Sequence, residues 1–446
     1  MRGFRSTLIL LVIFLGLLGY IYFYESRRPA TPPVEEKPKA FTVQPDKIEE
    51  LNVKAASGET TRLKKAAAGW EVVEPVSMTA AESEVTSITQ GLASLEIQRV
   101  VDENPSDLSQ FGLAQPKVDV AFRANGQTGL THLLIGDKTP TGSELYAKTQ
   151  DQQKVFLISS YLDGTFNRTP FDLRDKAILK FDREKVTGLE IARPKDALAF
   201  AKDGSRWNLD KPIRATADSA TVDGLIGQIQ SAQMVALTAN DAKELNRYGL
   251  DKPSVTTTIV TGDGRTTLQV GKRSNDGGAF YARDTARPLV FTISQALVTD
   301  LEKPASDYRL KDIFEFRPFN ATRLELTRDK QTLIFEKAKG ADPNAPGKWQ
   351  EVAPTKKDVD NTKFEGAVTQ LSALRADSFV DANASTGLKT PVASVVVKFD
   401  DGKQEDRVTF GKSGSDVYAA RGNEAGAAKL DAAAFDSAMN AFNEFK

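Results

Sequence analysis

The chain has 446 residues, of which 40% are hydrophobic and 27% are charged, a composition typical of a globular protein with about three domains. Its 59 Lys and Arg residues are balanced by 60 Asp and Glu residues, so it lacks the basic excess of a nucleic-acid-binding protein. It contains no Cys and a single His, His132, which excludes disulfides, thiolate catalysis and metal sites built from Cys or several His. We therefore expect no nucleic-acid partner and no cofactor, and we name no catalytic, cofactor-binding or metal-binding residue.

The N-terminal segment, residues 1–28, has the features of a membrane anchor. Arg2 and Arg5 precede an apolar run from residue 7 to residue 24 that carries no charge. The length of this run is near the lower limit for crossing a bilayer, and the aromatic residues that close it favour the membrane interface. The alternative is a cleaved signal peptide, but cleavage needs small residues, and bulky and charged residues follow this run.

We therefore predict an uncleaved helix that crosses the cytoplasmic (inner) membrane once. The N-terminus would lie inside, and the bulk of the chain would lie in the periplasm or outside the cell. Residues 29–40 follow as a linker, in which Pro29, Pro32, Pro33 and Pro38 favour an extended, semi-rigid spacer.

Five landmarks recur three times, in the same order, in the rest of the chain. Each set has a Trp, a Pro five residues later, a Gly-Leu pair, an apolar strand that ends in Gly, and a strand centred on Tyr. In this order they are Trp70, Trp207 and Trp349; Pro75, Pro212 and Pro354; Gly112, Gly249 and Gly387; Gly136, Gly271 and Gly411; and Tyr146, Tyr281 and Tyr418. We predict three tandem homologous domains, repeat 1 (41–177), repeat 2 (178–315) and repeat 3 (316–446). The first two also contain Asp-x-Arg-x-Lys, at 172–176 and 307–311, which we interpret as the junction to the next repeat.

A helix is predicted after each Trp, because apolar residues there are spaced three, four and three apart and share one helical face. Asp218 and Asp360 are plausible N-caps, whereas Ala81 stands at this place in repeat 1. The apolar sets are Val85, Ile88, Leu92 and Leu95; Val222, Leu225, Ile229 and Ala232; and Phe364, Ala367, Leu371 and Leu374.

The remaining pattern of each repeat predicts three strands before this helix, a four-stranded meander after it, and a short closing helix. Asn125-Gly126 marks one hairpin turn of the meander. Since strands and helices are segregated along the chain, we predict the α+β class with largely antiparallel sheets.

Residues 411–413, Gly-Lys-Ser, invite a phosphate-binding interpretation, but Asp406 stands where that motif needs a Gly. Gly136 and Gly271 occupy the matching place in the other repeats. A strand-end turn in which Gly adopts a positive φ explains all three positions better.

No other constellation points to catalysis. His132 has no counterpart in the other repeats, and Ser413 and Ser415 lack a His partner. We interpret the repeated Trp, Gly and Tyr residues as structural, and we expect each Trp to pack against the helix of its own repeat.

The ordered landmarks resemble the bacterial domain-of-unknown-function family 4340, with residues 248–253, Tyr-Gly-Leu-Asp-Lys-Pro, as the best single match. The resemblance covers residues 41–446 in three tandem copies. It implies a single-span envelope protein associated with gliding-motility or ABC-type transport systems, and it supplies no catalytic residue.

These observations lead us to expect a membrane-anchored accessory or scaffold protein that is not an enzyme. It would act outside the cytoplasm, with the membrane and subunits of an ABC-type transporter as partners. The alternative is a carbohydrate-active or wall-binding envelope enzyme that uses paired carboxylates, the one catalytic arrangement that the composition permits.

Overall fold

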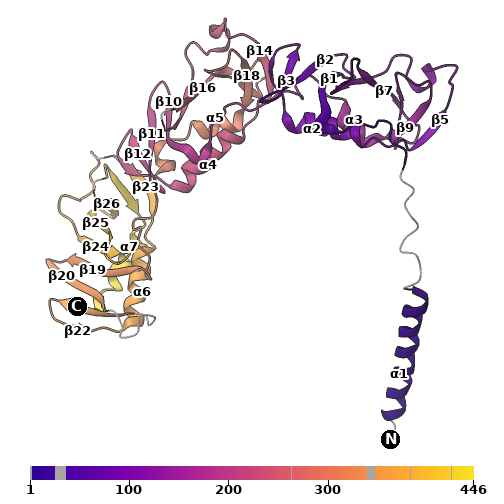
Figure 1. The fold of residues 1–446 in the computed structure, drawn as a ribbon. Helices are drawn as coiled ribbons and strands as arrows, with labels where there is room; N and C mark the ends of the chain where they lie inside the picture. Colours follow the sequence, from indigo (N-terminus) through magenta and orange to yellow (C-terminus); the bar gives the residue numbers. More distant parts are fainter. Residues whose placement is uncertain are drawn as a thin grey trace. The chain divides into compact units, whose positions relative to one another are not determined.

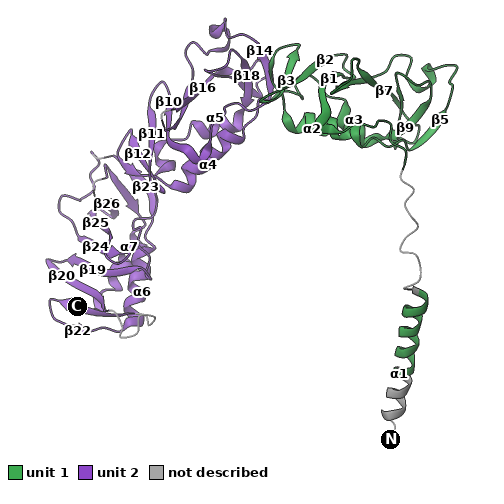
Figure 2. Cartoon of the chain, in the orientation of Figure 1, with its two compact units in different colours: residues 1–175 green, residues 176–446 purple. Residues whose placement is uncertain are grey.

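The computed structural model describes residues 3–25, 37–262, 264–338, 347–381, 383–422 and 424–445 (Figure 1). The chain divides into two compact units, residues 1–175 and 176–446 (Figure 2). Unit 1 contains repeat 1 up to residue 175, and unit 2 contains residues 176 and 177 together with repeats 2 and 3. Residues 29–36 of the predicted linker lie outside the described residues, as do residues 1, 2 and 26–28 of the predicted anchor.

Helix α1 covers Gly3–Tyr20 and continues as a π-helical turn over Ile21–Glu25. The large apolar side chains that the structure describes in residues 11–24 are exposed. Among the described residues, no helix is long and apolar enough to cross a membrane. The transmembrane part of the predicted fold therefore stays a prediction.

Each repeat forms one nine-stranded antiparallel sheet, and the strand order is the same in all three. In repeat 1 this order is β4-β3-β2-β1-β6-β7-β8-β9-β5. The elements of repeat 1 are β1 (Ile48–Lys54), β2 (Thr60–Ala66), β3 (Gly69–Glu74), β4 (Met78–Thr79), α2 (Glu82–Ala93), β5 (Arg99–Asp102), β6 (Val118–Ala124), β7 (Thr131–Lys138), β8 (Glu144–Thr149), β9 (Val155–Ser159) and α3 (Asp163–Phe166).

Repeats 2 and 3 contain the same series of elements. Repeat 2 has β10 (Val186–Ala192), β11 (Ala197–Asp203), β12 (Arg206–Lys211), β13 (Ala215–Thr216), α4 (Ser219–Ser231), β14 (Ala236–Ala239), β15 (Val255–Thr261), β16 (Gly264–Arg273), β17 (Ala279–Asp284), β18 (Val290–Ser294) and α5 (Gln295–Leu301). Repeat 3 has β19 (Ala321–Arg328), β20 (Gln331–Ala338), β21 (Lys348–Ala353), β22 (Lys357–Asp358), α6 (Asn361–Ser372), β23 (Ala376–Val380), β24 (Ala393–Phe399), β25 (Gln404–Ser413), β26 (Asp416–Arg421), β27 (Ala427–Leu430) and α7 (Ala432–Asn440).

The threefold repetition and the antiparallel sheets are confirmed, but α+β describes the fold only loosely, because it is mostly β. The predicted pattern lacks the two edge strands of each sheet. One is a two-residue strand before the helix, and the other follows the helix and pairs with the last strand of the meander. The second edge strand escapes prediction because Arg99–Asp102 and its counterparts show neither strict alternation nor a fully buried run.

The first strand of each repeat lies inside its sheet and holds the two halves together. In repeat 2, Leu189 of β10 lies opposite Phe200 of β11 on one side and Ile259 of β15 on the other. All three side chains are buried, so this central strand anchors the core of its repeat. The strand that pairs with the other edge of β10 is β15, which follows α4 and β14 in the chain.

The two helices of each repeat contact one another, and Figure 1 shows α4 and α5 together along one side of the repeat-2 strands. The predicted helical faces are confirmed for the first three members of each set, which are buried. The fourth members, Leu95, Ala232 and Leu374, follow the end of the helix, and Ala232 is only half-buried. Both predicted N-caps are also confirmed. Asp218 accepts a hydrogen bond from the Thr221 N–H, and Asp360 accepts bonds from two N–H groups of α6, whereas Ala81 gives no side-chain cap.

Each Trp packs against the helix of its own repeat, as predicted. Trp70 shares a buried cluster with Val85, the Trp349 ring lies 4.9 Å from the Phe364 ring, and Trp207 Nε1 donates to Asp223 Oδ1 of α4 at 2.9 Å. A further contact recurs on the Trp backbone. In all three repeats, the Trp N–H donates to the side chain of the first helical residue, which is Glu82, Ser219 or Asn361.

The aromatic or Thr residue and the Gly-Leu pair form a tight loop, here called the Gly-Leu corner (residues 111–113, 248–250 and 386–388). Its Gly has a positive φ in every repeat. The strand glycine lies directly beneath it, so a Cβ at Gly271 would overlap the Tyr248 carbonyl oxygen. Our expectation of a positive φ at the strand glycines is therefore wrong. They are needed because two backbones approach there without room for a side chain.

We expect Trp207→Ala to destabilise unit 2 by about 3–5 kcal/mol, the usual cost of removing a large buried aromatic side chain. Urea unfolding followed by far-UV circular dichroism measures this change. Phe319→Ala is the control, because that side chain is 82% exposed and its removal should change stability by less than about 0.5 kcal/mol. Equal effects of the two substitutions would contradict a core role for Trp207.

Gly271→Ala and Gly224→Ala should change stability in opposite directions. The first places a methyl group against the Tyr248 backbone and should destabilise unit 2, since neither backbone can move without breaking sheet pairing. The second lies in α4 with no atom within 4 Å of the added Cβ, and should stabilise by up to about 1 kcal/mol. Thermal unfolding of the two variants makes the comparison, and a stable Gly271→Ala protein would show that the corner tolerates a side chain.

Candidate functional site

The polar residues considered in the sequence occupy ordinary structural positions. His132 Nδ1 lies 2.9 Å from Asp119 Oδ1 across strands β6 and β7, and both side chains are about a quarter exposed (25% and 27%). Lys412 Nζ forms an ion pair with Asp436 at 2.9 Å, and Ser413 Oγ lies 3.5 Å from Ser385 Oγ. In the part of the chain that the structure describes, no group of three or more Asp, Glu or His residues could hold a metal ion.

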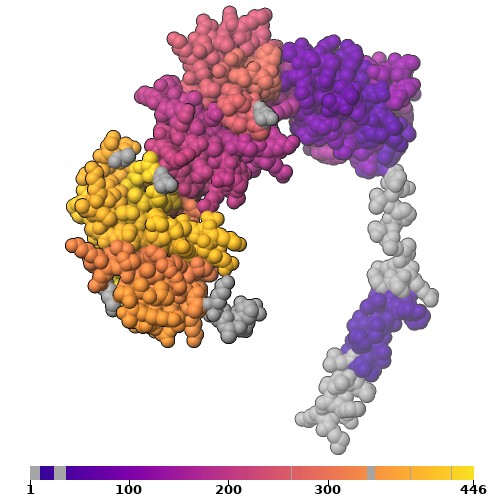
Figure 3. All heavy atoms as spheres, turned by 60° about the vertical axis from the view of Figure 1, so that its left-hand side comes forward, coloured from indigo at the N-terminus to yellow at the C-terminus, as the bar shows by residue number. Residues whose placement is uncertain are grey.

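Unit 2 contains a cluster of charged side chains, one buried, four half-buried and one exposed, that sequence reasoning missed. It lies where repeat 2 joins repeat 3, and the space-filling view shows these repeats in magenta and in orange to yellow (Figure 3). We call it the repeat joint and define it by the residues Arg206, Arg309, Glu315, Asp406, Arg421 and Glu424.

The connection between the repeats passes through the second Asp-x-Arg-x-Lys motif and is hydrogen-bonded on both sides. Toward repeat 2, the Leu310 N–H donates to the Thr216 carbonyl at 3.0 Å. Toward repeat 3, the Ala376 N–H donates to the Lys311 carbonyl at 2.8 Å. The predicted junction role of this motif is thus confirmed for residues 307–311.

Glu424 of repeat 3 gathers contacts from both repeats. Its Oε1 accepts a hydrogen bond from the Thr216 N–H of repeat 2 at 2.9 Å and lies 2.9 Å from Arg421 Nη2. Its Oε2 lies 3.3 Å from Arg309 Nη2. Arg309 is only 4% exposed, and its guanidinium lies 4.0 Å from the centre of the Phe379 ring. Burial lowers the pKa of Arg309, and the neighbouring Glu424 opposes that shift.

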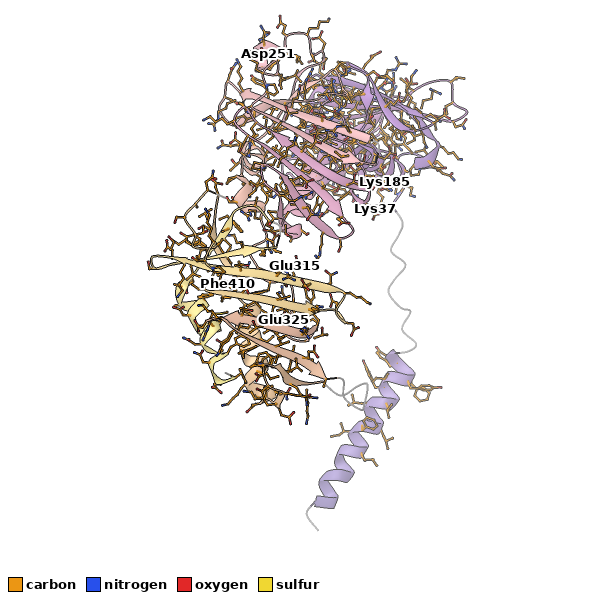
Figure 4. The ribbon with its side chains drawn as sticks, turned by 90° about the vertical axis from the view of Figure 1, so that its left-hand side faces the viewer. Lys37, Lys185, Asp251, Glu315, Glu325 and Phe410 are labelled. Carbon is orange, nitrogen blue, oxygen red and sulfur yellow. The ribbon has the colours of Figure 1, made fainter. Side chains whose placement is uncertain are left out.

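A second set of contacts crosses the joint through Glu315, the residue labelled in Figure 4. Arg206 Nη2 of repeat 2 lies 2.6 Å from Glu315 Oε2. Asp406 Oδ2 accepts hydrogen bonds from the Glu315 and Phe316 N–H groups at 2.7 and 2.9 Å. Burial raises the pKa of Glu315 above its usual value, although Arg206 opposes the shift. Burial likewise raises the pKa of Asp406, and there it outweighs the two backbone hydrogen bonds.

These contacts specify one arrangement of the two repeats at the joint. A different packing that kept the same groups buried would leave Arg309 and the carboxyl groups without their partners, which is unfavourable. The arrangement therefore stabilises one relation between repeats 2 and 3, and each of its displaced pKa values has a structural partner.

Two clefts lie at equivalent places beside the buried Trp of repeats 2 and 3. Val186 and Ala321 are the first residues of β10 and β19, and each lines the cleft of its repeat. The cleft of repeat 2 has a volume of about 330 Å³, and that of repeat 3 about 740 Å³. Each cleft contains a Lys whose ammonium lies over the Trp ring. The distance from Nζ to the ring centre is 5.4 Å for Lys202 and Trp207 and 5.7 Å for Lys337 and Trp349.

Comparison with known proteins identifies a family but no function. The model of the family described as "Domain of unknown function (DUF4340)" matches residues 70–208 and 207–391. The two matches support tandem copies within residues 70–391, whereas the resemblance predicted over residues 41–446 in three copies is matched only in part. No curated protein matches the chain.

Among solved structures, the chain aligns weakly with sliding clamps. A clamp from Pseudomonas aeruginosa with ligand shows 10% identity over 87% of this chain and 92% of that chain, with a TM-score of 0.15. Another clamp from the same organism, bound to griselimycin, shows 7% identity over 89% of this chain and 94% of that chain, with a TM-score of 0.14. A putative DNA polymerase III beta subunit from Eubacterium rectale shows 9% identity over 82% of this chain and 92% of that chain, with a TM-score of 0.14. TM-scores this low support no statement about fold or function.

Asp406→Asn and Asp416→Asn should respond to pH with opposite signs. Because the folded-state pKa of Asp406 is raised, ionising it costs stability that the neutral Asn keeps. The stability of Asp406→Asn relative to the native chain should therefore increase as the pH rises from about 4 to 7.

Asp416 is the matched control, since its hydrogen bond to Lys429 lowers its pKa. Its contribution is present above the unfolded-state pKa and is lost as the pH falls through the folded-state pKa, so its substitution should cost most near pH 7. Urea unfolding at several pH values measures both differences. Parallel profiles for the two variants would contradict the assigned electrostatics.

Proposed function

Because this chain belongs to the DUF4340 family, a family of unknown function, we propose from its own features that it is a membrane-anchored, non-catalytic scaffold. Its three repeats would present binding surfaces outside the cytoplasm. The partner would be a subunit of an ABC-type transport or gliding-motility-like system, which is the association that the family resemblance implies.

The repeat joint is the observation that carries this proposal. In unit 2, the carboxyl groups with raised pKa values, Glu315 and Asp406, are hydrogen-bonded or ion-paired across or beside the connection between repeats. Displaced pKa values often mark catalytic groups, but they also arise in structural ion-pair networks. Here the partners of each group favour the structural role.

The anchor is supported by the uncharged run of residues 7–24 and by the exposed apolar side chains of α1. Exposed apolar surface of this extent marks a site that another apolar phase or protein covers. A bilayer is the cover that the preceding Arg2 and Arg5 and the closing aromatic residues favour.

The alternative is an envelope enzyme with paired carboxylates, and its general acid would most readily be Glu315 or Asp406, the two carboxyl groups whose pKa values burial raises. A glycosidase needs two carboxyl groups facing one substrate-binding cleft. Neither carboxyl lines the clefts beside Trp207 and Trp349, and Asp406 is engaged by two backbone N–H groups. The scaffold is therefore the better-supported proposal.

Crosslinking in cells followed by affinity purification from membranes tests the scaffold. The full chain should recover an ABC-type ATPase or permease. A variant that lacks residues 1–28 should leave the membrane fraction and stay folded, because the repeats begin beyond that segment. Recovery of no transporter subunit by the full chain would contradict the proposed partner, and a deletion variant that stays with the membranes would contradict the anchor.

A further inference from the structure

The clefts beside Trp207 and Trp349 differ in one respect that points to a ligand. In repeat 2, Arg183 precedes the first strand by three residues, and its guanidinium lies in the cleft. Its Nη2 donates to the Asp223 carbonyl of α4 at 3.1 Å, and the guanidinium also packs close to Gly227. Repeat 2 therefore places a cation of its own against this helix.

Repeat 3 has the same cleft without that cation. Pro318 holds the place of Arg183, three residues before β19, as Pro45 does before β1, and the cleft of repeat 3 is the larger of the two. Glu365 stands where repeat 2 has Asp223, in the first turns of α6. Its carbonyl accepts a hydrogen bond from the Thr369 hydroxyl at 2.7 Å, so the acceptors left for a ligand are carboxylates.

The charge of the repeat-3 cleft is negative. Among the residues that line it, Glu365, Asp400 and Asp401 face a single cation, Lys337, whose Nζ lies 3.9 Å from Glu365. The Asn320 amide donates to Asp400 Oδ1 at 3.0 Å, which leaves Asp401 as an exposed carboxylate at the rim. This surplus favours a cationic ligand over a neutral or anionic one.

Phe319 adds a flat apolar surface to the same cleft. Its side chain is 82% exposed, the highest value among the exposed large hydrophobic residues of the described chain. A guanidinium can stack on an aromatic ring while its N–H groups pair with carboxylates, a combination that an ammonium matches less well.

We propose that the repeat-3 cleft binds an arginine side chain of a partner protein, in the place where repeat 2 uses its own Arg183. The guanidinium would lie against Phe319 and donate to Asp401 and Glu365. The inference deepens the proposed scaffold function and rests on it, because it supplies the chemistry by which the scaffold holds a peptide segment of its partner.

Isothermal titration of the full chain in detergent tests the inference with a short Gly-Arg-Gly-Arg-Gly peptide and its Gln counterpart. The Arg peptide should bind with one site and weaken with added salt, and the Gln peptide should not bind. Phe319→Ala and Asp401→Asn should each weaken binding by about tenfold. Pro318→Arg should abolish binding by placing an internal guanidinium in the cleft.

Tyr161→Ala is the matched control, since it removes an aromatic side chain that is 75% exposed in repeat 1, and it should leave binding unchanged. Equal binding of the Gln peptide, or native affinity in Phe319→Ala, Asp401→Asn and Pro318→Arg, would overturn the inference. So would a neutral oligosaccharide that binds the cleft while the Arg peptide does not.

Crosslinking separates this inference from the scaffold proposal. If Pro318→Arg still recovers the transporter subunits at native yield, the cleft is not the docking site and the scaffold proposal stands. If the native chain recovers none, the scaffold proposal fails even where the peptide binds.

Discussion

The close approach of two backbones at the Gly-Leu corner is the constraint on which each repeat depends. The corner crosses the second meander strand where that strand carries a Gly, and neither chain leaves room for a Cβ. The aromatic ring of the corner then lies against the Tyr of the next strand, at 5.1 Å for Phe111 and Tyr146 and 5.0 Å for Tyr248 and Tyr281. Three landmarks that are far apart in the sequence are therefore parts of a single contact.

Sequence patterns predicted the elements that bury a continuous apolar face. The helices after Trp70, Trp207 and Trp349, the meander and the Asp caps follow from apolar periodicity and hydrogen-bonding chemistry, which are local properties. The edge strands were missed because they form only by pairing with a neighbour that the rest of the fold supplies. The strand glycines were noticed for the wrong reason, since close backbone approach leaves no local signal different from a turn.

The repeat joint and the clefts could not be predicted in the same way. Glu424 contacts Thr216 and Arg309, and the local sequence around these residues gives no signal that predicts a partner so distant along the chain. The clue that was available is internal comparison. Aligning Arg183 with Pro318, and Asp223 with Glu365, shows where repeats 2 and 3 differ, and a difference at an equivalent place in the fold is informative even without homologues.

The position of the first strand at the centre of its sheet has a consequence for synthesis. Once β11 has been made, β10 can pair with it, but the other edge of β10 stays unpaired until β15 has been made, after α4 and β14. For that interval each repeat is a half-sheet with one unpaired edge, the kind of surface that recruits strands from other chains. The other repeats contain strands at the same place in the same sheet order, but the partner from its own repeat is the one nearest to each β10-type strand along the chain.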